Sequence, residues 1–398
     1  MERLHLKLKE INHVIKEEVS KENNVGILDG LSGIALFQFY YSKYLESENI
    51  YEDALITLQK CFEKINDGYS LPTFCSGIAG FGWTIDHLVE NNFIELDNDE
   101  LLSGFDEYIH NVMVFSLNKK NFDFLHGGIG YALYFINRYR NTSLESLKLS
   151  YKAKIYEFIS LLESFADKTS NQYKWEKVSN GEKVYDLSLS HGMSSIIGIL
   201  NKLYELPEFR DRVRDILVGT INFIVELHYL ENKLSLYAST ISVVNNKNQD
   251  NSRLAWCYGD LGIATVLLQS SYLLKSESLR KKVIYILEFS SKRKNLEENS
   301  VFDLGICHGT MGISHIFKNI CHKLNTNTFQ DTSKYWLNKG LELSIYDDNY
   351  LGVKKWDPSI KSFIPDLSLL EGAAGVGLVI INSLAPLNTK WDECLMLN

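Results

Sequence analysis

Hydrophobic residues along the chain follow two alternating helical patterns. One is amphipathic, with apolar residues at three- and four-residue spacing among charged ones, which is typical of a surface helix. The other is an almost continuous apolar run, such as IALFQFYY from residue 34 or IATVLLQSSYLL from residue 263, which favours a largely buried helix. The amphipathic segments cover residues 4–20, 51–66, 97–117, 148–167, 207–230, 278–293 and 332–346.

A Gly-x-x-Gly element precedes each apolar run, so the chain consists of seven repeats. The first glycines are Gly30, Gly77, Gly127, Gly192, Gly259, Gly309 and Gly372. The second glycine is kept in every copy except the fourth, where Ser195 stands. Successive copies are 47 residues (Gly30 to Gly77) to 67 residues (Gly192 to Gly259) apart, which leaves room for two helices and a loop in each repeat.

These repeats predict an all-α fold, an α/α toroid (double-layered barrel) of seven outer and seven inner helices. We expect one domain that spans residues 1–398, with all seven glycine loops at the same end, at the N-termini of the inner helices. The intervals before the fourth, fifth and seventh loops are longer, and period-2 apolar positions with turn signals such as Asn180-Gly181 predict short β-hairpins over one rim. These hairpins either contact substrate or only cover helix ends.

Composition excludes several functional classes. The 398 residues are 45% hydrophobic, which is typical of a globular protein, and the net charge of −9 without a basic run argues against nucleic-acid binding. The N-terminal segment lacks the apolar core of a signal peptide, and no apolar stretch approaches 18 residues. Six cysteines without a secretory signal indicate free thiols in a reducing compartment, so we expect a cytoplasmic protein.

Two cysteines and a histidine form the candidate metal site. Cys257 and Cys307 occupy equivalent positions in adjacent repeats, and His308 directly follows the second cysteine. Adjacent repeats are neighbours in a toroid, so the three side chains can meet in a soft donor set that suits Zn²⁺ with one coordination position open. The alternatives are that the cysteines are merely small buried hydrophobes, or that His126 or Cys75 closes a structural site as the fourth ligand.

The residue before each first glycine is polar in all seven repeats. These residues are Asp29, Ser76, His126, His191, Tyr258, His308 and Glu371. A toroid would place them around one central cavity, where buried polar groups need partners or a task.

Short motifs around these positions resemble the lanthionine synthetase cyclase family. The motifs are Trp256-Cys257-Tyr258-Gly259, Cys307-His308-Gly309, Ser190-His191-Gly192 and Glu371-Gly372. The resemblance covers nearly the whole chain, because all seven repeats are present. It implies an α/α toroid with a zinc ion at one end that joins peptide Cys thiols to dehydroalanine or dehydrobutyrine, forming lanthionine or methyllanthionine thioether rings.

The resemblance also implies roles for individual residues. Cys257, Cys307 and His308 would bind the zinc, Asp123 would match the catalytic aspartate and His191 the catalytic histidine, and Arg253, Trp256 and Tyr258 would match cavity residues. An imidazole suits protonation of the enolate that follows thiol addition, Asp123 could orient it, and Arg253 could stabilise the enolate oxygen. Alternatively, His191 is a hydrogen-bonded core histidine and Asp123 a helix cap.

The same resemblance implies partners. The chain lacks the large N-terminal dehydratase region of fused synthetases, so it looks like a stand-alone cyclase. Its substrate would be a dehydrated precursor peptide with leader and core. Its expected partners are a dehydratase and an ABC exporter, which would associate it peripherally with the membrane.

Four competing functions remain at this point. A prenyltransferase subunit also activates a thiol with zinc, but those barrels have six repeats and a carboxylate ligand. An enzyme of the same fold could add glutathione to dehydroamino acids. A glycosidase needs a carboxylate pair, for which Asp123 with Glu371 is the nearby candidate. A non-enzymatic zinc-containing scaffold would bind peptide without turnover.

Overall fold

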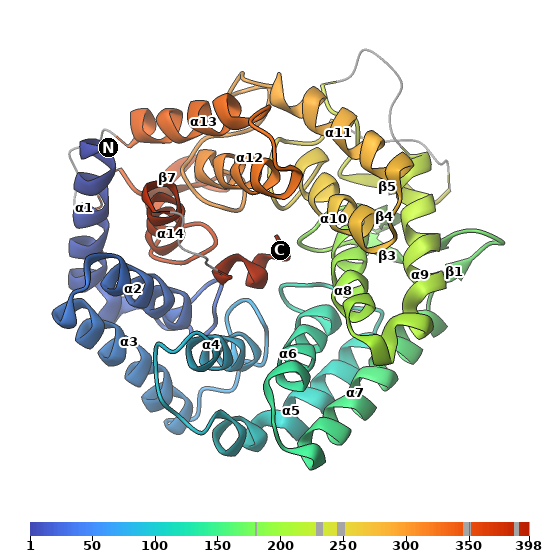
Figure 1. Cartoon of the computed structure of the whole chain (residues 1–398), viewed down its shortest axis with the longest axis horizontal. Helices are drawn as coiled ribbons and strands as arrows, with labels where there is room; N and C mark the ends of the chain where they lie inside the picture. The colour runs from blue at the N-terminus through green and yellow to red at the C-terminus, as the bar shows by residue number, and fades with distance from the viewer. Residues whose placement is uncertain are drawn as a thin grey trace. The chain divides into compact units, whose positions relative to one another are not determined.

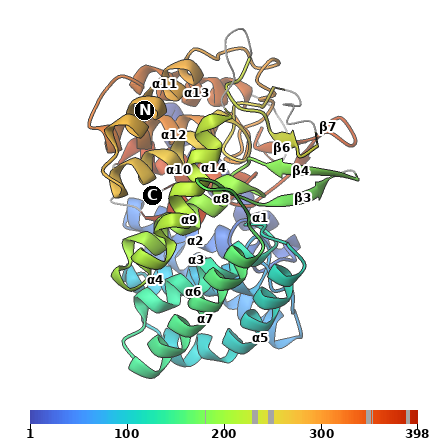
Figure 2. The same cartoon turned by 90° about the vertical axis from the view of Figure 1, so that its right-hand side faces the viewer.

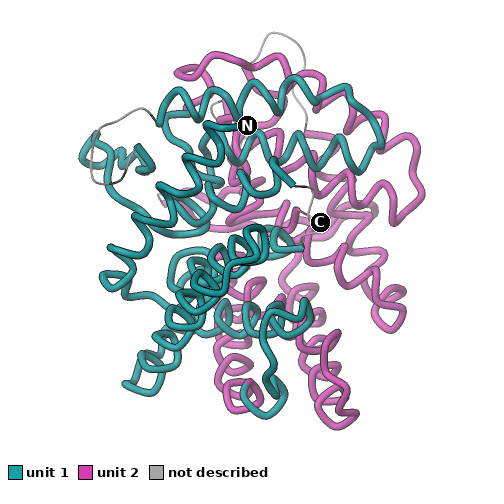
Figure 3. Tube along the Cα trace, turned by 60° about the vertical axis from the view of Figure 1, so that its left-hand side comes forward, with its two compact units in different colours: residues 1–101, 301–395 teal, residues 102–300, 396–398 magenta. Residues whose placement is uncertain are grey.

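The computed structural model describes residues 1–179, 181–227, 234–244, 251–344, 350, 352–385 and 390–397. The chain divides into two compact units. Unit 1 comprises residues 1–101 with 301–395, and unit 2 comprises residues 102–300 with 396–398 (Figure 3). Each unit is therefore assembled from chain segments that carry several of the repeats.

All seven amphipathic segments are helices. They are α1 (Glu2–Glu18), α3 (Glu48–Asn66), α5 (Asn98–Asn118), α7 (Glu145–Ser164), α9 (Pro207–Glu226), α11 (Glu277–Ser291) and α13 (Gln330–Leu343). Residues 228–230 and 345–346 of the predicted helices lie outside the described residues. A typical member buries one stripe only: in α11 this stripe includes Leu279, Val283 and Leu287 at helical spacing.

All seven apolar runs are helices too, and each begins directly after a first glycine. They are α2 (Leu31–Leu45), α4 (Ile78–Glu90), α6 (Gly128–Asn141), α8 (Met193–Glu205), α10 (Asp260–Leu273), α12 (Thr310–Leu324) and α14 (Ala373–Leu384). These helices are buried almost all round, and α14 is buried from Ala373 to Asn382. Among the described helices, none combines the length and apolar content needed to cross a bilayer.

Within each unit the inner helices pack side by side, and all of them except α4 have an outer helix of the same unit packed against them. In unit 1 the order is α12, α14, α2 and α4, with α13 against α12, α1 against α14 and α3 against α2 (Figure 1). In unit 2 the order is α6, α8 and α10, with α7, α9 and α11 against them in turn. Within each unit, the loop that precedes an inner helix is thereby brought beside the loop of the neighbouring inner helix of that unit.

In the described residues, short antiparallel sheets confirm the hairpins predicted before the fourth and seventh loops, whereas the segment before the fifth loop contributes a single strand and not a hairpin of its own. Strands β3 (Glu176–Ser179) and β4 (Glu182–Asp186) are antiparallel and extend to β5 (Thr240–Ser242), while β6 (Lys354–Asp357) pairs with β7 (Ser362–Pro365) (Figure 2). The predicted turn residue Asn180 and the segment 245–250 lie outside the described residues. The predicted helix 148–167 ends earlier, at Ser164, because β1 (Asp167–Lys168) pairs instead with β2 (Tyr173–Lys174).

Main-chain hydrogen bonds connect the glycine loops of neighbouring repeats in unit 1. The Cys307 N–H donates to the Leu370 carbonyl at 2.9 Å, the Leu370 N–H donates to the Leu28 carbonyl at 2.9 Å, and the Leu28 N–H donates to the Cys75 carbonyl at 3.0 Å. Each loop is therefore held by the backbone of the next one, which fixes the position of its side chains.

Candidate metal centre and active site

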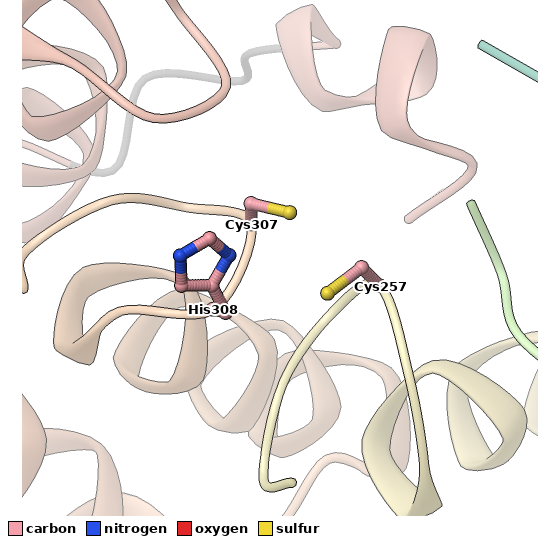
Figure 4. Close-up of side chains that lie close together, drawn as sticks. All are labelled: Cys257, Cys307 and His308. Carbon is pink, nitrogen blue, oxygen red and sulfur yellow. The ribbon is translucent and has the colours of Figure 1, made fainter. Parts of the chain in front are cut away.

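Cys257, Cys307 and His308 point toward one another from two glycine loops (Figure 4). Their ligand atoms, two sulfurs and one ring nitrogen, all lie within 4.8 Å of one another. Both cysteines are buried, and His308 is half-buried. Among the described residues no fourth His, Cys, Asp or Glu joins this cluster, so neither His126 nor Cys75 closes it. The donor set matches a zinc site with three protein ligands.

Two carboxylates flank the His308 ring. Its Nε2 lies 3.5 Å from Oδ2 of the buried Asp303, and its Nδ1 lies 3.8 Å from Oε1 of Glu371. Asp303 is itself fixed, because Gly305 N–H donates to it at 3.1 Å and Trp356 N–H of β6 at 3.0 Å. Asp303, the closer of the two, can orient the ring and raise its basicity, as carboxylates beside metal-binding imidazoles do.

The Cys257 loop depends on a glycine backbone. Gly259 adopts φ +88°, and a Cβ at this position would lie 2.3 Å from Oγ of Ser252 and 2.6 Å from the Arg253 carbonyl oxygen. The Leu189 N–H donates to the Cys257 carbonyl at 2.9 Å, so this loop is held by its neighbour, as in unit 1. A tight turn and a main-chain brace together present the Cys257 thiol.

A buried arginine fastens both ends of the same loop. The Arg293 guanidinium donates to Oδ2 of Asp260 at 2.9 Å, to the carbonyl of Ser252 at 2.8 Å and to Oδ1 of Asn299 at 2.7 Å. Because Ser252 and Asp260 bracket Cys257, one planar side chain fixes the span between them. The sequence pattern does not reveal the role of Arg293, since an arginine at the end of an amphipathic helix is typical of a surface charge.

Asp123 and His191 form a hydrogen-bonded pair. Oδ2 of Asp123 lies 2.6 Å from Nδ1 of His191, and its Oδ1 accepts from the N–H groups of Leu125 at 2.7 Å and His126 at 2.8 Å. In three other glycine loops a hydroxyl residue stands at the position of Asp123 and only accepts a hydrogen bond from the backbone N–H three residues later. These residues are Thr73, Ser188 and Ser368. Asp123 is therefore both a loop cap and the partner of His191.

The pair shifts both ionisations. Burial alone would lower the pKa of His191, but the hydrogen bond and the charge of Asp123 raise it above its ordinary value. Burial would raise the pKa of Asp123, yet the hydrogen bond from His191 lowers it below its ordinary value. The pair thus stabilises the protonated imidazole relative to that of an isolated histidine, which suits a general acid.

The other three expected cavity residues, Tyr258, Trp256 and Arg253, differ in their burial and contacts. The Tyr258 ring lies 6.0 Å from the His191 ring, centroid to centroid. Trp256 is fully buried and packs against Phe124. Arg253 is half-buried, and within the described part of the chain its guanidinium forms no hydrogen bond or ion pair.

Ser195, the departure from the glycine repeat, leaves its turn intact. Gly192 has φ −143° and ψ −154°, close to the −143° and −160° of Gly127 in the preceding repeat. The Ser195 hydroxyl donates to the Gly192 carbonyl at 2.7 Å, so the buried side chain has a partner. His191 consequently keeps the backbone geometry of its sister positions.

A pocket of about 500 Å³ lies beside the pair. Asp123 and His191 line it together with the start of α8, the α5–α6 connection and strand β3. Pockets of roughly 300–1,000 Å³ are typical of ligand sites, so the imidazole faces a space of the right size for a substrate segment.

Comparisons with known proteins place these features in context. The sequence profile of the family described as "Lanthionine synthetase C-like protein" matches residues 21–396. The chain is 24% identical to the nisin biosynthesis protein NisC of Lactococcus lactis subsp. lactis over 343 residues, which cover 81% of this chain and 76% of that protein. In structure it matches nisin cyclase with a TM-score of 0.77 at 19% identity, over 100% of this chain and 98% of that one.

The structural match confirms the predicted α/α toroid class. A GH76 α-mannanase of Bacteroides thetaiotaomicron shares the fold more distantly, with a TM-score of 0.50 at 13% identity over 96% of this chain and 95% of that one. The two carboxylates considered for a glycosidase already have partners here: Asp123 binds His191, and Glu371 pairs with Lys355 at 3.0 Å.

Proposed function

Because the chain belongs to the lanthionine synthetase C-like family, we propose that it is a lanthipeptide cyclase. It would join Cys thiols of a dehydrated precursor peptide to dehydroalanine or dehydrobutyrine, forming thioether rings. The observation that carries this proposal is the cluster of Cys257, Cys307 and His308, whose ligand atoms lie within 4.8 Å of one another. The named relatives, nisin biosynthesis protein NisC and nisin cyclase, support it.

The donor set fits one Zn²⁺ ion held by Cys257, Cys307 and His308. Two sulfur donors and one imidazole are typical of zinc, and three ligands leave a position for a substrate thiol. A bound zinc ion would supply Lewis acidity that deprotonates this thiol at neutral pH, where a free thiol with a pKa of about 8.5 is mostly protonated.

The protein side chains would then complete the addition. A C–S bond forms at the β-carbon of the dehydroamino acid, and its double-bond electron pair moves to give an enolate. His191 donates a proton to the α-carbon, which replaces the proton lost from the thiol, so the overall addition is balanced. Asp123 holds Nδ1, which leaves Nε2 as the nitrogen that exchanges the proton.

Arg253, Tyr258 and Trp256 have supporting roles in this proposal. The Arg253 guanidinium is half-buried and permanently charged, so it is suited to stabilise the enolate oxygen. Tyr258 lies next to the His191 ring and shapes the cavity around it, whereas Trp256 supports that wall from its buried side. A dehydratase would supply the substrate and an ABC exporter would remove the product, at the cytoplasmic face of the membrane.

Zinc content and ring formation test the proposal together. Single alanine variants of Cys257, Cys307 and His308 are expected to lose zinc and cyclisation, whereas Cys61→Ala, which removes a buried thiol elsewhere, keeps both. Ring closure is measured by mass spectrometry after thiol alkylation of a dehydrated precursor peptide. A parallel reaction with glutathione separates cyclisation from intermolecular addition. Full zinc content in all three alanine variants would refute the metal assignment.

A further inference from the structure

The pocket beside His191 has a strand as one of its walls. Five consecutive residues, 175–179, line it, and they include all of β3. Neighbouring side chains of a strand point to opposite faces, so a strand that contributes consecutive residues presents its edge to the pocket rather than one face.

β3 is an edge strand with outward-facing backbone groups. In the order β3-β4-β5 it pairs with β4 alone, and Val178 is opposite Lys183. The Lys183 carbonyl accepts from Val243 N–H on the β5 side, at 3.0 Å. In an antiparallel ladder the partner of such a residue also points away, so the Val178 N–H and carbonyl face the open edge. Val178 is 70% exposed, so this part of the strand is open to solvent.

The strand is tied to the His191 loop by polar contacts. Lys177 of β3 pairs with Asp186 at 2.5 Å, and Asp186 accepts from Ser188 N–H at 2.8 Å. The Ser188 hydroxyl in turn accepts from the His191 N–H at 3.0 Å. The edge of β3 and the imidazole are therefore held in one frame, so a strand paired with β3 has a fixed position relative to His191.

We propose that an extended segment of the precursor peptide binds by strand addition to the β3 edge, which delivers the adjoining dehydroamino acid to His191. This inference rests on the proposed function and deepens it, because β3 and His191, the proposed general acid, line the same pocket. The four residues of β3 span about 13 Å at roughly 3.3 Å per residue, enough for three or four residues of peptide. Main-chain pairing of this kind accepts many side chains.

Val178→Pro tests the proposal by removing one outward N–H donor, and proline is tolerated at such a position of an edge strand. Val178→Ala is the matched control, because it keeps the N–H. Fluorescence anisotropy with a labelled dehydrated precursor peptide measures Kd, and mass spectrometry measures KM and kcat. Loss of one hydrogen bond is expected to raise Kd and KM about three- to ten-fold for the proline variant, with zinc content and kcat unchanged. The alanine variant keeps this donor, so its Kd and KM are expected to stay closer to the wild type than those of the proline variant.

Equal Kd values for both variants and the wild type, with cyclisation intact, would overturn strand addition and leave the proposed function standing. A different outcome is that the wild type binds the peptide, Val178→Pro binds it more weakly, and neither closes a ring. This result would refute the cyclase proposal and support the binding site. If the proline variant does not fold, a precursor peptide N-methylated at one backbone amide beside the dehydroamino acid replaces it. Unchanged wild-type affinity for a series of such peptides, methylated at each flanking amide in turn, would also overturn the proposal.

Discussion

Replacing Asp123 by serine separates its two structural tasks. A serine hydroxyl caps the loop in two sister repeats, where Ser188 accepts from His191 N–H and Ser368 from Glu371 N–H. The variant should therefore keep its loop conformation and its zinc. It loses the contact of 2.6 Å between Oδ2 of Asp123 and Nδ1 of His191. The imidazole then has neither its orienting partner nor the charge that raises its pKa.

The size of the effect follows from that one contact. Hydrogen bonds to charged groups contribute about 1.5–3 kcal/mol, and 1.36 kcal/mol is a factor of ten, so kcat should fall roughly 10- to 150-fold. The basic limb of the pH–rate profile should move to lower pH, because a general acid loses activity as the pH rises through its pKa and Asp123 raises that pKa.

The assay is ring closure of a dehydrated precursor, followed by mass spectrometry with thiol alkylation between pH 5 and pH 9. Asp97→Ser is the matched control, since it makes the same chemical change at an exposed cap, where Asp97 accepts from Glu100 N–H at 2.9 Å. A near-normal kcat with an unmoved basic limb in Asp123→Ser would refute the role of the pair.

Stability should show the same pair through its pH dependence. The raised pKa of His191 stabilises the fold below the unfolded pKa of about 6.5, and this contribution is lost as the pH rises through the folded pKa. The lowered pKa of Asp123 stabilises it above the unfolded value of about 3.9, and this is lost as the pH falls. Urea unfolding should therefore separate wild type from Asp123→Ser most between about pH 4 and pH 6.5, and a constant difference at all pH values would contradict this.

Three further predictions concern the metal loop and the metal. Gly259→Ala should cost about 1–3 kcal/mol more in unfolding free energy than Gly68→Ala, because both glycines have positive φ but only Gly259 has atoms where a Cβ would lie; equal losses would contradict the close approach. Arg293→Met should destabilise the protein by about 3–5 kcal/mol, and adding Asp260→Leu should restore part of that stability, because it removes the buried unpaired carboxylate. The same variant should weaken zinc binding about 10- to 100-fold in a chelator competition. Unchanged zinc affinity would contradict the role of Arg293 in holding the Cys257 loop. Metal removal by a chelator should abolish turnover reversibly while helical circular dichroism persists, and full turnover by the chelated protein would count against the metal.

Much of the fold follows from the sequence because each element has a strong local signal. Continuous apolar runs and amphipathic segments mark the fourteen helices, and a glycine directly precedes each inner one, such as Gly309 before α12. A tertiary contact overrides the local pattern at Asp167, where the helical spacing continues but the backbone pairs with β2.

The site was predictable only in part. Cys257 and Cys307 occupy equivalent positions in adjacent repeats, and adjacent repeats of a toroid are neighbours in space. The sequence therefore predicts that the two thiols lie close together. The Arg293–Asp260 pair carries no such signal, because its burial comes from segments 33 residues apart that close over both side chains. Nor does composition distinguish the fully buried Trp256 ring from one that lines an open cavity.

The main-chain bonds between glycine loops have a consequence for protein engineering. They use the N–H and carbonyl groups of Leu28 and the carbonyl group of Cys75, so the side chains displayed there do not take part in joining the loops. Cys75 already stands where Cys307 stands in its own repeat. Leu28→Cys with Ser76→His would place the same set of two thiols and one imidazole on a second pair of loops. The repeat architecture therefore allows a second metal site to be designed from the residues of the first.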